Sequence, residues 1–199
     1  MANPAAPPSP VAADGTRAYP MAPLIRFTLL ALYLALVLPL PLLAPAGLRL
    51  PLVGAVPLGL VLVLAITSER VELDQRGLRV GHPAWCAWWL RRGWSLPWES
   101  IAALTPVATS QGGRVFYVRT KAMEPGPAPA WLLPQRVAGF EDFLARFSAH
   151  TGIDTSAVGP ISPAWTYRLL ALLCGLMLLG EALVAVIGAG WLQGAAVVS

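Results

Sequence analysis

The sequence predicts a membrane protein with three transmembrane helices and one small water-facing α+β domain. Residues 27–48 and 50–68 contain no charged side chain, and residues 169–199 contain only Glu181. A run of about 18 or more apolar residues can cross the hydrocarbon core of a bilayer as a helix. Residues 69–163, between the second and third runs, hold most of the charge and most of the turn-forming residues. We therefore expect this segment to face water.

Composition supports the membrane class and argues against nucleic-acid binding. The chain is 56% hydrophobic and 12% charged, whereas soluble domains carry about 25% charged residues. The net charge of +4 includes no basic run, so we expect no nucleic-acid partner. Cys86 and Cys174 lie in different segments and have no metal-ligand spacing, which predicts free thiols.

The N-terminal segment precedes the first apolar run. Residues 1–20 are rich in proline and alanine, which predicts a disordered tail. A secretory signal is not expected, because no basic segment lies directly before an apolar core.

The first two membrane helices are predicted as a hairpin over residues 21–68. The first begins near Pro23, because proline is tolerated in the first turn of a helix. Pro39 and Pro41 should kink or end it, and Pro57 should kink the second helix. Such prolines persist in membranes because neighbouring groups satisfy the freed carbonyls.

The third membrane helix is predicted over residues 164–192, between a linker at 156–163 and a short tail at 193–199. Basic residues near helix ends favour the cytoplasmic side. Arginines precede the first and third helices and follow the second, whereas Arg49 alone occupies the short loop. We therefore expect a cytoplasmic N-terminus and polar domain, with the C-terminus on the opposite side. Predicted interface anchors are Tyr19, Trp165, Tyr167 and Trp191.

Glu181 is a candidate functional residue within the third helix. It follows Arg168 by about 20 Å along a helix axis, which places it deep in the bilayer. An intramembrane carboxyl group is costly and is therefore a functional hypothesis. Two alternatives remain open: helix packing or docking of another membrane protein, and proton or ion chemistry.

The segment at residues 69–133 has the pattern of short antiparallel strands. Residues 69–74 and 77–81 alternate apolar and polar side chains around a turn, which predicts a β-hairpin. A further strand is expected at residues 84–90. A second hairpin is predicted from residues 101–109 and 114–120, and a short strand from residues 131–133.

The period then changes to that of an amphipathic helix. Val137, Phe140, Phe143, Leu144 and Phe147 follow a 3.6-residue spacing, and a glycine at 152 supplies a stop. Short strands closed by one helix make residues 69–155 a small α+β domain.

Two motifs in this domain are similar to a known family. The turn LDQRGL at residues 73–78 and the segment LPWESI at residues 96–101 resemble bacterial pleckstrin-homology-like (PH-like) domains carried on membrane helices. The resemblance covers about residues 69–152 and implies an antiparallel sandwich or barrel capped by a C-terminal helix. It also implies binding or scaffolding, with no catalytic residues or cofactor.

Two further resemblances concern the whole chain. Two membrane helices before such a domain are similar to the photosystem I assembly factor family of cyanobacteria and plastids, although the third helix departs from that pattern. Residues 91–98, 111–113 and 132–140 resemble small uncharacterised cyanobacterial membrane proteins. These likenesses imply a bacterial inner or thylakoid membrane.

The candidate binding surface is a tryptophan- and arginine-rich stretch at residues 82–98, which contains five of the eight tryptophans. Three interpretations stay open: core filling, contact with lipid headgroups or a partner protein, and a pigment or cofactor site beside His82. In a strand, Trp85 and Trp89 would share one face and Trp88 the other. The candidate residues are Trp85, Trp88, Trp89, Arg91, Arg92, Trp94 and Trp98.

The sequence contains no known catalytic motif. It has no nucleophile elbow, P-loop, dinucleotide fingerprint or zinc-protease motif. We therefore expect a non-enzymatic protein without cofactor, metal or small-molecule substrate. The expected role is binding of a membrane protein or lipid headgroups in the assembly, stabilisation or regulation of a membrane complex, with photosynthetic complexes as one candidate. The alternative is a proton-coupled carrier or channel component that uses Glu181.

Overall fold

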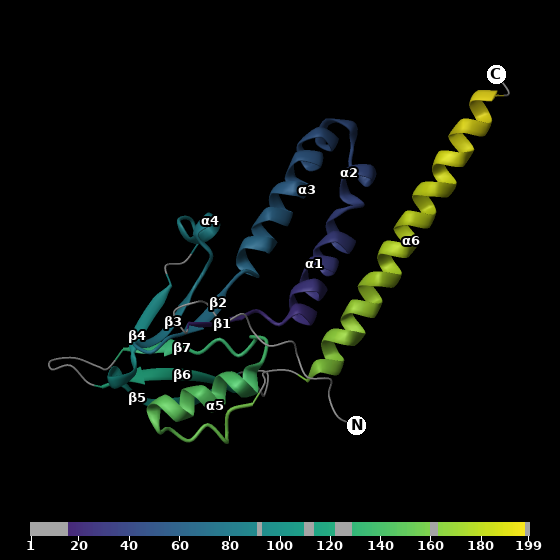
Figure 1. Cartoon of the computed structure of the whole chain (residues 1–199). Helices are drawn as coiled ribbons and strands as arrows, with labels where there is room; N and C mark the ends of the chain where they lie inside the picture. The colour runs from purple at the N-terminus through teal and green to yellow at the C-terminus, as the bar shows by residue number, and fades with distance from the viewer. Residues whose placement is uncertain (1–15, 91–92, 110–113, 122–128, 160–162, 198–199) are drawn as a thin grey trace. The chain divides into compact units, whose positions relative to one another are not determined.

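The computed structural model describes residues 16–90, 93–109, 114–121, 129–159 and 163–197 (Figure 1). The chain divides into two units. One contains residues 1–23 and 65–163, and the other contains residues 24–64 and 164–199. The first unit carries the strands, and the second carries the long apolar helices.

The first unit contains a four-stranded antiparallel sheet in the order β1-β2-β3-β4. Its strands are β1 (Arg17–Pro20), β2 (Arg70–Leu73), β3 (Gly77–Gly81) and β4 (Trp94–Pro97). The hairpin of β2 and β3 confirms the prediction from alternating side chains. Asp74 closes its turn, because its carboxylate accepts hydrogen bonds from the backbone N–H groups of Arg76 and Gly77 at 2.7 Å.

Strand β1 corrects the predicted disordered tail at its C-terminal end. Ala18 lies opposite Glu72 and Tyr19 opposite Val71, so the edge of β2 supplies the backbone partners. Four residues are too few to show a strand period among prolines and alanines. Tyr19 is fully buried and is therefore not an interface anchor. The rest of the predicted tail, residues 1–15, lies outside the described residues.

Helix α4 (Ala84–Ala87) replaces the strand predicted at residues 84–90. The carbonyl of Pro83 accepts hydrogen bonds from the N–H groups of Cys86 and Ala87 at 3.1 and 3.0 Å. Proline is well suited to the start of a helix, and alanine is the best helix former. The tryptophans suggested a strand, but the residues between them favour a helical turn.

The second sheet is three-stranded and antiparallel, in the order β5-β6-β7. Its strands are β5 (Ile101–Ala108), β6 (Arg114–Thr120) and β7 (Ala130–Leu132), as the second hairpin and last strand predicted. A short 3₁₀ turn, η1 (Trp98–Ser100), connects β4 to β5. The predicted turn at residues 111–113 lies outside the described residues.

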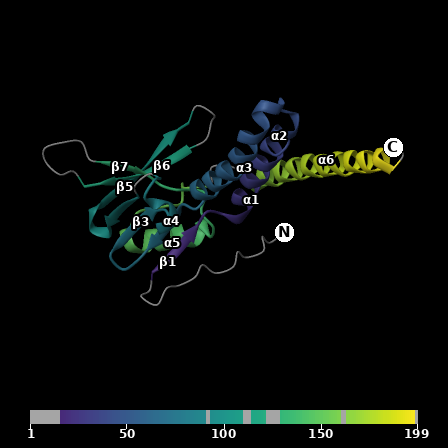
Figure 2. The same cartoon turned by 90° about the horizontal axis from the view of Figure 1, so that it is seen from above.

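Helix α5 (Phe140–Thr151) confirms the predicted amphipathic helix and covers the core of the first unit (Figures 1 and 2). It lies between Gly139 and Gly152, whose φ angles are 65° and 70°. Glycine adopts these left-handed angles without a Cβ penalty. Phe143 and Phe147 pack with residues from both sheets.

The second unit contains α1 (Pro23–Val37), α2 (Leu40–Leu43), α3 (Ala46–Ile66) and α6 (Ala164–Val197). Three spans confirm the predicted length and apolar character of membrane helices: Pro23–Leu43, Ala46–Ile66 and Ala164–Gly188, with mean hydropathies of 2.0, 2.2 and 2.5. Pro39 and Pro41 lie at the break between α1 and α2, as predicted, because neither has an N–H to continue the helix.

Two polar side chains within the second unit, Tyr33 and Thr28, donate to backbone carbonyls. The Tyr33 hydroxyl donates to the Val56 carbonyl at 2.7 Å and joins α1 to α3. Gly59 lies beneath this ring, where a Cβ would overlap the Tyr33 hydroxyl. The Thr28 hydroxyl lies 2.7 Å from the Leu24 carbonyl and 3.3 Å from the Tyr167 carbonyl of α6.

Candidate binding surfaces

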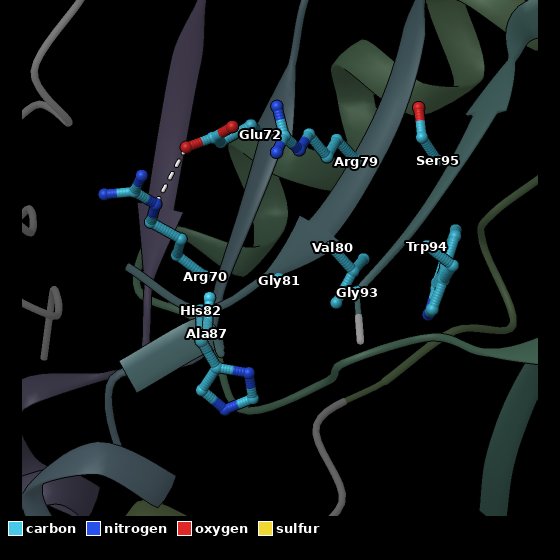
Figure 3. Close-up of a pocket in the computed structure, with 10 residues that line it drawn as sticks. All are labelled: Arg70, Glu72, Arg79, Val80, Gly81, His82, Ala87, Gly93, Trp94 and Ser95. Atoms are coloured by element: carbon cyan, nitrogen blue, oxygen red, sulfur yellow. Dashed lines mark ion pairs between the residues drawn. The ribbon is translucent and has the colours of Figure 1, made fainter. Parts of the chain in front are cut away.

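A polar cavity lies over the face of the four-stranded sheet that points away from the core. Strand alternation sends Val71 and Leu73 inward, and their neighbours Arg70 and Glu72 to the opposite face. The cavity has a volume of about 370 Å³. Its lining residues, shown in Figure 3, are Arg70, Glu72, Arg79, Val80, Gly81, His82, Ala87, Gly93, Trp94 and Ser95.

Two arginines and one carboxylate line this cavity. The Nε of Arg70 lies 2.8 Å from Oε1 of Glu72. Arg79 is directly opposite Glu72 in the register of β2 and β3, and its guanidinium extends toward that carboxylate in Figure 3. Among the described residues Arg79 forms no ion pair. The cavity therefore has an excess positive charge with guanidinium donors available for an anionic group.

Gly81 and Gly93 line this cavity where the backbone before β4 approaches β3 closely. Gly93, just before β4, lies so close to β3 that a Cβ would overlap the Val80 carbonyl and approach Gly81 Cα at 2.8 Å. His82 follows β3, and its Nδ1 is buried with no hydrogen-bond partner in the described part of the chain. His82 thus adds a buried, unpartnered polar atom to the lining of the cavity, and no metal ligand set forms around it among those residues.

Three of the predicted tryptophans form an exposed cluster on and beside α4. The side chains of Trp85, Trp88 and Trp89 are 50%, 83% and 41% exposed. The rings of Trp88 and Trp89 lie 6.4 Å apart, and Trp88 Nε1 donates to the Trp85 carbonyl at 3.1 Å. Because this segment is helical, the predicted division of Trp85 and Trp89 from Trp88 on opposite strand faces is wrong. We call these three residues the α4 tryptophan cluster.

Cys86 and Ala87 lie between the tryptophans of the α4 tryptophan cluster in the sequence. Cys86 is fully buried, and its Sγ lies 3.5 Å from the Pro83 carbonyl of the same helical turn. Ala87 lines the polar cavity, so α4 forms part of the cavity wall. The cluster and the arginines therefore belong to one continuous region of the first unit.

The other two tryptophans belong to the packing of the domain. Trp98 is buried, stacks edge-on against Phe147 at 6.0 Å, and donates from Nε1 to the Asp74 carbonyl at 3.0 Å. Trp94 is half-buried and stacks on Trp131 at 5.7 Å. The core-filling interpretation thus holds for Trp98 and partly for Trp94. Arg91 and Arg92 lie outside the described residues.

Sequence reasoning missed Arg70, Glu72 and Arg79 as site residues. The signal was present in the alternation of β2 and β3, which already places them on the face opposite Val71 and Val80. Their association with α4 could not be predicted, because that segment was expected to be a strand.

A separate polar group joins β1 to α5. The Tyr19 hydroxyl donates to Asp142 Oδ2 at 2.6 Å, and Arg146 Nε lies 3.2 Å from the same oxygen. Burial, followed by this hydrogen bond, raises the pKa of Tyr19 to about 12. Partial burial acts to raise the pKa of Asp142, but the hydrogen bonds from Tyr19 and Arg146 outweigh it and hold that pKa below its usual value. These groups stabilise the fold.

Glu181 lies in the second unit, on α6. It lines an apolar cavity of about 540 Å³ together with residues of the α1–α2 break and its own helix. Its Oε2 atom is buried and has no hydrogen-bond partner among the described residues. The cavity walls are otherwise apolar: Leu38, Pro39, Leu42, Leu43, Leu178, Gly180, Ala182, Val184 and Ala185.

Comparison with known proteins identifies one relative. No family model matches the chain, and no solved structure matches it. The chain is 43% identical over 164 residues to the uncharacterized protein slr0269 of Synechocystis sp. (strain ATCC 27184 / PCC 6803 / Kazusa). The aligned region covers 80% of each chain. This agrees with the resemblance to uncharacterised cyanobacterial membrane proteins. The chain therefore belongs to the same protein family as slr0269.

Proposed function

We propose that this chain is a non-enzymatic, membrane-anchored docking protein. Its three apolar spans hold the α+β domain at a membrane, and that domain binds an acidic segment of a partner protein. The role is assembly, stabilisation or regulation of a larger membrane complex. The observation that supports this proposal is the α4 tryptophan cluster beside a cavity lined by two arginines and only one carboxylate.

The residue types in this region are those that dominate protein interfaces. Tryptophan and arginine are the commonest energetic hot spots, and they act together when water is excluded around them. Trp88 is 83% exposed, although tryptophan is highly buried on average. A partner that covers the indoles would also shield Arg79, which strengthens its attraction to a carboxylate.

The chemistry favours a protein partner over lipid headgroups alone. Three spans of the chain are long and apolar enough to supply membrane attachment, so the indoles are not needed as a further anchor. Glu72 also lines the cavity, and its charge would weaken the attraction of a phosphate that is not held by other contacts. A protein segment offers both a carboxylate for Arg79 and apolar side chains for the α4 tryptophan cluster.

Two finer features belong to this proposal. The domain has the two small sheets and the C-terminal helix of a PH-like sandwich, and we propose that fold for it. We also propose that the domain lies on the cytoplasmic side, and the arginines beside the spans support this by the positive-inside rule.

Co-purification from cells that naturally make the protein tests the docking proposal. Trp85→Ser combined with Trp88→Ser, and separately Arg79→Gln, should each reduce recovery of the bound partner. Loss of a tryptophan hot spot should weaken binding by roughly thirty-fold or more. Matched controls are Val107→Ser and Arg114→Gln, which alter an exposed apolar and an exposed basic residue of the second sheet. The controls should leave recovery unchanged.

Brominated lipids distinguish the membrane from a partner protein as the target. The purified full chain is placed in vesicles of brominated lipid, which quenches the fluorescence of tryptophans that it contacts. The unaltered chain and the Trp85→Ser, Trp88→Ser variant should show the same quenching. Quenching of those indoles by the lipid, together with undiminished partner recovery from the variants, would contradict the proposal and assign the cluster to the bilayer.

A further inference from the structure

The apolar cavity around Glu181 has the features of a docking groove for another helix. One wall is the break at Pro39 and the short helix α2, and the other wall is the part of α6 that carries Glu181. Both walls belong to spans that are long and apolar enough to cross a membrane. Leu42, Leu43 and Val184 at the rim are exposed, so the groove is open to an occupant.

Glu181 requires a hydrogen-bond donor from whatever occupies this groove. Its Oε2 is buried and unpartnered in the described structure, in a cavity with otherwise apolar walls. A carboxyl group in such a place needs a hydrogen-bond donor, because an unsatisfied polar atom in hydrocarbon is costly. Lipid acyl chains can fill the groove but cannot donate to Glu181.

Small residues make close approach of a helix feasible. Gly180, Ala182 and Ala185 line the α6 side of the groove. Membrane helices associate where small residues let their backbones approach and where polar side chains bond across the contact. The groove combines both properties, with Glu181 as the polar group.

A second copy of this chain meets the requirement less well than a different protein. Within residues 28–44, 50–66 and 169–188, the side chains with oxygen or nitrogen atoms are Thr28, Tyr33 and Glu181. Thr28 is bonded to the Leu24 carbonyl and Tyr33 to the Val56 carbonyl. A second copy would therefore present only another Glu181, which donates a hydrogen bond only in its protonated form. A partner with a permanent donor thus fits the groove better.

We propose that the Glu181 groove docks a transmembrane helix of another membrane protein, which presents an amide, hydroxyl or imidazole donor to Glu181. This deepens the proposed docking function, on which it rests, by naming a contact inside the membrane. The two sites lie in different units of the chain, so each can be tested without the other.

A model peptide tests the groove with a defined probe. The purified full chain, labelled with a donor fluorophore, is placed in lipid vesicles with acceptor-labelled transmembrane peptides at high dilution. One peptide has about 20 apolar residues, all leucine across its centre, and the other has a single central asparagine. Energy transfer should show roughly three- to thirty-fold tighter association of the asparagine peptide.

Substitutions at Glu181 assign that preference to the carboxyl group. Glu181→Leu should abolish the preference for the asparagine peptide, whereas Glu181→Gln should keep it because an amide can still bond to asparagine. Met177→Leu, one turn away on α6, is the matched control and should keep the preference. The Trp85→Ser, Trp88→Ser variant should also keep it, which separates this inference from the docking site of the α+β domain.

Three results would overturn the inference. The first is equal binding of both peptides by the unaltered chain. The second is a preference that persists in Glu181→Leu. The third is transfer between two labelled copies of the chain that depends on Glu181, because the groove would then serve self-association.

Discussion

At the scale of single residues, Asp142 shows how one carboxylate can fasten a strand to a helix. It accepts hydrogen bonds from Tyr19 of β1 and Arg146 of α5, and Arg17 Nε lies 3.5 Å away as an ion pair. Its side chain is 43% exposed, so solvent screens much of the charge attraction. The short bond from buried Tyr19 is therefore the strongest of these contacts.

The pKa shifts of this pair predict a pH dependence. The folded pKa of Asp142 lies below its unfolded value, so the free energy of unfolding falls as pH drops from about 4 through the folded pKa. The pKa of Tyr19 is raised to about 12, so stability is also lost as pH rises above about 10. Tyr19→Phe should lower the free energy of unfolding by about 1 kcal/mol near neutral pH and reduce both pH effects.

Thermal unfolding of the chain in mild detergent, followed by near-UV circular dichroism between pH 3 and pH 11, measures these changes. Tyr117→Phe is the matched control, because the Tyr117 hydroxyl has no hydrogen bond within the described residues. An identical pH profile for Tyr19→Phe and the unaltered chain would show that the bond to Asp142 contributes nothing.

At the scale of elements, the sequence pattern predicted the helices and strands whose side chains repeat with a regular period. The apolar spans, the hairpins and α5 repeat their pattern over enough residues to be recognised. Strand β1 and helix α4 have four residues each, too few for a period. The conformation of β1 depends on pairing with the edge of β2, which forms only in the folded structure. The conformation of α4 depends on Pro83, which begins the turn, and on the burial of Cys86.

The candidate site was predictable only in part for the same reason. The exposure of Trp85, Trp88 and Trp89 depends on whether residues 84–90 form a strand or a helix, so it could not be predicted from the sequence. Arg70 and Arg79 come from different strands, and the position of Arg79 opposite Glu72 depends on the register of β2 and β3. Glu181 was identified directly, because a carboxyl group in a long apolar run needs no fold to be noticed.

Packing of α5 predicts a large effect from one core residue. Phe143 is fully buried and contacts Tyr19 at 5.6 Å between ring centroids. Phe143→Ala should lower the free energy of unfolding of the domain by about 3–5 kcal/mol, because a cavity replaces the ring. Urea unfolding followed by the near-UV signal measures this, with Glu141→Ala on the exposed face of α5 as control. A loss below about 1 kcal/mol would mean that α5 is not part of the cooperative core.

At the scale of the whole molecule, strand pairing restricts how the chain can cross a membrane. Residues 17–20 precede the first span, and residues 70–73 follow the second, yet they pair as β1 and β2. Both ends of the helical hairpin must therefore lie on the same side of the bilayer. We propose that this side is the cytoplasm, because the arginines lie beside these ends of the spans.

Cysteine labelling in intact cells tests this orientation. Ser95→Cys in the domain should react with a membrane-impermeant maleimide only after permeabilisation. Leu48→Cys, at the start of α3, should react without it. The native thiols, Cys86 and Cys174, are buried and should give a low background. Labelling of Ser95→Cys from outside intact cells would reverse the assigned sides.

The pairing of β1 with β2 also has a consequence for biogenesis. The α+β domain is interrupted in the sequence by the helical hairpin, so its first strand is synthesised well before the strand it pairs with. During translation β1 has to remain unpaired while both helices insert. Completion of the sheet thus depends on the return of the chain to the side on which it started, because a chain in which only one of the two spans crosses leaves β1 and β2 on opposite sides of the membrane.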